Sequence, residues 1–118
     1  MAYEVDIPGV LERVRGELEA ELGQGRVHYE PAKVNPPGVW INFRTLEIKT
    51  LEGVFVSLEL VLAVPSSDAV TVAGKLSELW NTVVGLYGAP DGPIRTQSTL
   101  FPDTPNPRPS LVVPYLAR

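Results

Sequence analysis

The sequence predicts a single α+β domain of 118 residues, with one mixed or antiparallel sheet of four to five strands and two helices on one face of it. Three observations support this. Residues Val54–Val64 place an aliphatic side chain at every even position, and strand side chains alternate between the two faces of a sheet. Two stretches on either side show helical spacing of apolar residues. The expected element order is α-β-β-β-α-β-β, with Val54–Val64 as the central strand.

The first helix is predicted over Asp6–Leu22, where apolar residues recur at helical spacing. Asp6 can cap its start, Pro8 lies in the first turn where no N–H is needed, and Gly23 can end it. A short strand over Arg26–Tyr29 and a proline-rich loop over residues 30–38 should follow.

A long hairpin is expected next, in which Val39–Lys49 pairs with the central strand. The connection Leu51-Glu52-Gly53 suits a three-residue loop whose glycine adopts a positive φ. This loop would pair Ile48 with Val56 and Leu46 with Leu58.

The apolar residues of the first hairpin strand fall at odd positions up to Phe43 and at even positions from Leu46 onward. One extra residue, with Arg44 and Thr45 both opposite Glu59, would return every aliphatic side chain to one face, as a β-bulge does. Arg44 would then lie beside a carboxylate. The alternative is an unbulged hairpin whose tip is apolar on its other face.

A second helix is expected to begin after a cap at Ser66 or Ser67 and to end near Gly88. Two further strands follow at residues 94–101 and 110–116, and Pro114 argues for an edge position or a bulge in the latter. Pro102–Pro109 holds four prolines in eight residues and should be extended and stiff. The expected buried stripe of the helix is Ala69, Val72, Ala73, Leu76, Leu79, Trp80, Val83, Val84 and Tyr87.

With both helices on the aliphatic face, the opposite face carries Trp40, Phe55 and Val61 among mostly polar residues. Scattered exposed hydrophobic residues are normal on a monomer, so this pattern alone decides nothing. The alternative is that a neighbouring subunit covers this face. We take Trp40, Phe55, Val61 and the connection Leu51, Glu52 and Gly53 as candidates for subunit contacts.

The net charge of -4 resides in the first 25 residues, since the other 93 are balanced. No Lys/Arg cluster is present, so sequence-specific binding of DNA or RNA is not expected. The acidic first helix either keeps the protein soluble or lines a channel past which DNA slides. No apolar stretch approaches the length of a membrane span, and the N-terminus lacks the features of a secretory signal.

Candidate catalytic chemistry is sparse. His28 is the one histidine, and with no cysteine a zinc site would need three carboxylate or water ligands. No nucleophile elbow and no glycine-rich phosphate loop occur, and Glu17 and Glu21 lie one turn apart on a polar helix face. We therefore expect a protein that is not an enzyme and that uses no cofactor or metal.

Several segments resemble the tail terminator proteins of long-tailed bacteriophages, especially those of actinobacterial hosts. They are Pro36-Pro-Gly-Val-Trp-Ile41, Val54–Val64 followed by Pro65-Ser-Ser-Asp68, Asp91-Gly-Pro-Ile-Arg95 and Leu111-Val-Val-Pro114. The likeness spans nearly the whole chain, and the family has no catalytic signature.

The resemblance implies a structural protein of the virion tail and neck, present in the host cytoplasm during assembly. Such proteins form a ring, usually a hexamer, that caps the head-proximal end of the tail tube and stops its polymerisation. The free face of the ring docks the head-completion connector. Candidate contacts with the tube or connector are the stiff-loop residues Pro36, Pro37, Pro102, Pro105, Pro107, Arg108 and Pro109. Two alternatives remain: another head–tail connector or tail-completion component, and a monomeric α+β binding module.

Replacing Pro102–Pro109 with a Gly/Ser linker should leave a soluble, folded protein that attaches poorly to tails or heads. A stiff loop loses less conformational entropy when it docks than a flexible one does. Attachment of heads to tails in an assembly assay is the measurement, and unchanged attachment would count against a docking role for this loop.

Overall fold

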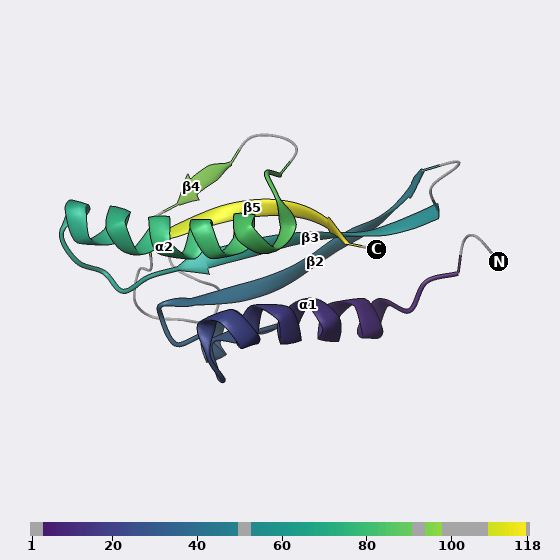
Figure 1. The fold of residues 1–118 in the computed structure, drawn as a ribbon, viewed down its shortest axis with the longest axis horizontal. Coiled ribbons are helices and arrows are strands. Elements are labelled where there is room, and N and C mark those ends of the chain that lie inside the picture. Colours follow the sequence, from purple (N-terminus) through teal and green to yellow (C-terminus); the bar gives the residue numbers. More distant parts are fainter. Residues whose placement is uncertain (1–3, 50–52, 91–93, 98–108, 118) are drawn as a thin grey trace.

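The computed structural model describes residues 4–49, 53–90, 94–97 and 109–117 (Figure 1). Along the chain the elements are α1 (Ile7–Leu22), β1 (Val27–His28), a 3₁₀ turn (Pro31–Lys33), β2 (Gly38–Lys49), β3 (Gly53–Ala63), α2 (Ala69–Tyr87), β4 (Arg95–Gln97) and β5 (Ser110–Ala117).

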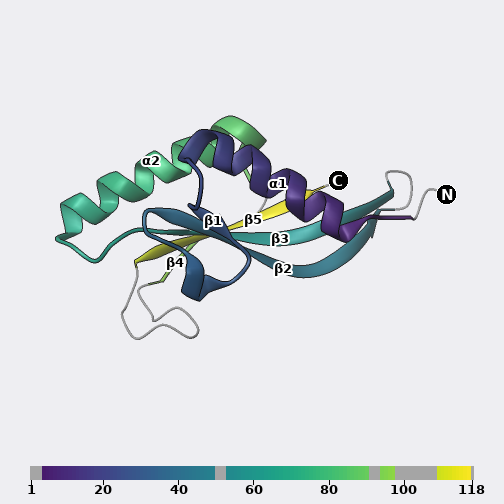
Figure 2. The same cartoon turned by 90° about the horizontal axis from the view of Figure 1, so that it is seen from below.

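The five strands form one mixed sheet in the order β1-β2-β3-β5-β4. The β1–β2 pair is parallel and the other pairs are antiparallel. Both helices lie on the same face of the sheet (Figure 2). The predicted fold class is confirmed, including the central place of the aliphatic strand.

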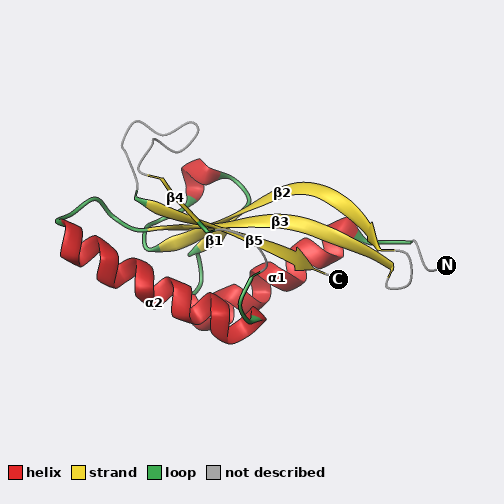
Figure 3. Cartoon of the chain, turned by 90° about the horizontal axis from the view of Figure 1, so that it is seen from above, coloured by secondary structure: helices red, strands yellow, loops and turns green. Residues whose placement is uncertain are grey.

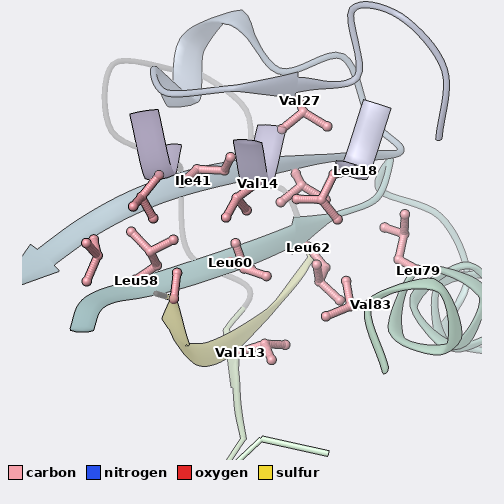
Figure 4. Packing of buried hydrophobic residues seen from close by; sticks show 14 of the residues in the cluster. Val14, Leu18, Val27, Ile41, Leu58, Leu60, Leu62, Leu79, Val83 and Val113 are labelled. Carbon is pink, nitrogen blue, oxygen red and sulfur yellow. The ribbon is translucent and has the colours of Figure 1, made fainter. Parts of the chain in front are cut away.

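The core forms between β3 and the two helices. Every even-numbered residue of β3 from Val56 to Leu62 is buried and belongs to one cluster. Val14 and Leu18 of α1 and Leu79 and Val83 of α2 join this cluster from the helix side (Figure 4). The alternation of β3 therefore brings both helices to one face, as the sequence predicts.

Both ends of α1 are formed by the residues that the sequence predicts. The side chain of Asp6 accepts a hydrogen bond from the backbone N–H of Gly9, Pro8 lies in the first turn, and Gly23 ends the helix at φ 106°. A carboxylate at the N-cap satisfies one of the free N–H groups of the first turn.

The predicted cap of α2 is wrong by one or two residues. Asp68, not Ser66 or Ser67, is the N-cap, and its carboxylate accepts from the backbone N–H of Thr71 at 2.9 Å and from the Thr71 hydroxyl at 2.8 Å. These hydrogen bonds lower the pKa of Asp68. A carboxylate that accepts two hydrogen bonds is a stronger cap than a serine hydroxyl.

The hairpin register differs by two residues from the prediction. Leu46 pairs with Val56 and Ile48 with Val54, and Lys49 pairs with Gly53 across a connection of residues 50–52. The shift is even, so each side chain keeps its predicted face. Gly53 has φ 99°, so the glycine with positive φ closes the ladder instead of lying within the loop. Leu51 and Glu52 lie outside the described residues.

The predicted β-bulge is present, with Arg44 as the extra residue between Phe43 and Thr45. Phe43 pairs with Leu58 and Thr45 with Ser57, so the bulge lies opposite these two residues instead of Glu59, because the register has shifted. The predicted proximity to a carboxylate is confirmed, since Nη1 of Arg44 lies 3.7 Å from Oε1 of Glu59.

β5 lies between β3 and β4 and is not an edge strand, but Pro114 lies in a part of β5 that is open on its β4 side among the described residues. Within the described residues, β4 pairs with β5 only from Ser110 to Val112, so Pro114 lies beyond that pairing. Its missing N–H therefore removes no bond to β4. The predicted strand at residues 94–101 is observed at Arg95–Gln97, and residues 98–101 lie outside the described part.

Gly38 marks the close approach of β2 to the loop before it. A Cβ at this position would lie 2.5 Å from the carbonyl oxygen of Arg26 and 2.9 Å from that of Asn35, both of which are backbone atoms. At Gly74 in α2 an added Cβ meets nothing within 4 Å.

Gly38→Ala should therefore lower the free energy of unfolding by about 1–3 kcal/mol, as overpacking does. The matched control Gly74→Ala should raise it by about 1 kcal/mol or less, because alanine is the better helix former. Urea unfolding followed by circular dichroism measures both. Equal effects of the two substitutions would contradict the described path of the loop.

Candidate assembly surface

β3 is longer than either of the two helices that cover the sheet. The 11 residues of β3 span about 36 Å at roughly 3.3 Å per residue, whereas the 16 residues of α1 span about 24 Å. β5 ends its pairing with β3 at Val56. Beyond that point the described strands β2 and β3 continue as a two-stranded ribbon (Figure 3). We call this ribbon, together with residues 43–45 at the bulge beside the end of β5, the hairpin arm (residues 43–49 and 53–56).

The hairpin arm exposes apolar side chains on its helix-facing side. Phe43, Leu46 and Ile48 have exposed fractions of 41%, 39% and 68%. All three pair with even-numbered residues of β3, because the bulge at Arg44 corrects their parity. These side chains therefore continue the aliphatic face of β3 past the end of its helical cover.

A second exposed apolar side chain lies at the other end of the molecule, which measures 50 Å along its longest axis. The first turns of α2 extend beyond the sheet, opposite to the hairpin arm (Figure 1). Val70 there is 82% exposed. The predicted stripe of α2 is thus buried only in its second half, and Ala69 and Ala73 are exposed, contrary to the prediction.

The face of the sheet opposite the helices, which we call the second face, is covered at Val61 by the chain itself. Val61 is 2% exposed and clusters with Ala63, Val112 and Val34, and Val34 comes from the loop after β1. This loop, with its 3₁₀ turn, crosses the second face (Figure 2). The expectation that Val61 contacts a neighbouring subunit is therefore wrong, because the chain covers this residue itself.

Tyr29 holds this loop in place. Its hydroxyl donates to Oε1 of Glu12 in α1 at 2.8 Å, and its carbonyl oxygen accepts from the indole N–H of Trp40 at 3.1 Å. Partial burial and the hydrogen bond to Glu12 raise the pKa of Tyr29 to about 12. Trp40 is half-buried against the Val61 cluster, so only part of its surface is available to another molecule.

The remaining predicted contact residues are placed as follows. Phe55 is half-buried, with the ammonium group of Lys49 5.2 Å from its ring centroid. Gly53 is half-buried at the start of β3. Pro36 is half-buried, and Pro37 is exposed beside the start of β2. Pro109 is half-buried, and its carbonyl oxygen accepts from the N–H of Val64. Pro102, Pro105, Pro107 and Arg108 lie outside the described residues.

A groove of about 470 Å³ runs between the end of α2 and the edge of β5. The rings of Tyr87 and Tyr115 form part of its wall, with centroids 4.3 Å apart. The Tyr87 hydroxyl donates to Oε1 of Glu17 at 3.2 Å, and burial together with the Glu17 charge raises the pKa of Tyr87. These contacts tie α2, β5 and α1 together.

The described residues include no group of histidine, cysteine and acidic side chains that could hold a metal. His28 lies with Nε2 3.0 Å from the carbonyl oxygen of Gly25, a contact that ties the strand to the turn before it. Neither described helix is long and apolar enough to span a membrane.

Comparison with known proteins adds no relative: no family model matches the chain, and no curated protein or solved structure matches it either.

The exposed side chains of the hairpin arm should contribute little to the stability of one subunit. Ile48→Ala should change the free energy of unfolding of the monomer by about 0.5 kcal/mol or less. Leu60→Ala, at a fully buried position of β3, should lower it by about 2–5 kcal/mol. Denaturant titration at low protein concentration compares the two, and a cost at Ile48 similar to that at Leu60 would show that the arm is packed within the subunit.

Proposed function

We propose that this protein is a structural component of a bacteriophage tail that assembles with copies of itself into a ring, as tail terminators do. The observation that carries the self-assembly is the hairpin arm, which exposes three large apolar side chains beyond the helical cover. The phage setting comes from the resemblance of the sequence segments that include Pro36–Ile41 and Val54–Val64.

A two-stranded ribbon is at best marginally stable in water on its own. The exposed side chains Phe43, Leu46 and Ile48 lose contact with water if a neighbouring subunit covers them, and burial of apolar surface favours association. A contact between two different surfaces of identical subunits closes into a ring when its rotation divides the circle. The elongated subunit, with apolar exposure at both ends, is suited to such a contact.

In this proposal the ring caps the head-proximal end of the tail tube. Tube growth stops because the outer face of the ring no longer offers the repeating surface of the tube, and the head connector docks there instead. The ring order expected from the resemblance is six. Trp40, Phe55, Gly53 and the loop prolines remain candidates for contacts within the ring or with these partners.

One observation favours a different function. The groove beside Tyr87 and Tyr115 is large enough for a small ligand or a peptide side chain, as in a monomeric binding module. Its charged lining residues, Glu47 and Lys49, balance each other. Oligomeric state separates the two functions, since a binding module has no need to assemble.

Purified protein should form a species larger than a dimer in analytical ultracentrifugation, and negative-stain images should show rings. Assembly should weaken on dilution, and addition of purified tail tubes should place the rings at one tube end. A protein that stays monomeric at high concentration and leaves tubes uncapped would contradict the proposal and favour the binding module.

A further inference from the structure

We draw no further inference here: the strongest candidate, the groove between the end of α2 and the part of β5 that is open on its β4 side among the described residues, has charged lining residues that balance each other, Glu47 and Lys49, and nothing in the structure shows what covers it.

Discussion

The alternation of β3 is the constraint on which the rest of the structure depends. Its even-numbered side chains form one aliphatic face, and burial of that face is the main favourable term for both helices. The face is longer than α1, so a part of it has no helix above it. The hairpin arm is the consequence: the strand that organises the core also carries the apolar side chains that the subunit cannot cover.

The subunit protects other parts of its sheet. The loop from Pro31 to Val34 covers the second face at Val61, and Tyr29 fixes this loop to α1 and to Trp40. The uncovered edges of the sheet carry a bulge at Arg44 and a proline at position 114. Bulges and prolines are devices that discourage strand pairing between molecules. The exposed helix-facing side of the arm has no such protection, which makes it the surface best suited to a specific contact.

Local patterns in the sequence predicted most of the fold. Some patterns depend only on the local backbone conformation, and these were predicted correctly. They are the alternation of Val54–Val64 that marks the strand, the capping residues of α1, and the change from odd to even apolar positions that marks the bulge at Arg44. The hairpin register was not predicted correctly, because an even shift keeps every residue on its face and the pattern cannot distinguish the two pairings. The cap of α2 was misplaced because serine and aspartate are both good caps and stand side by side.

The candidate surface was predicted less well, since exposure depends on tertiary packing. Val34 is an isolated apolar residue in a proline-rich segment, and only its contact with Val61 shows that the loop covers the second face. The mismatch in length between β3 and α1, by contrast, could have been calculated from the predicted elements. It would have directed attention to Phe43, Leu46 and Ile48 instead of Val61.

Hydrogen–deuterium exchange of the protein below and above its assembly concentration tests the central claim most directly. The account predicts that amides of the hairpin arm gain protection on assembly. No gain of protection on the arm at any concentration would contradict it.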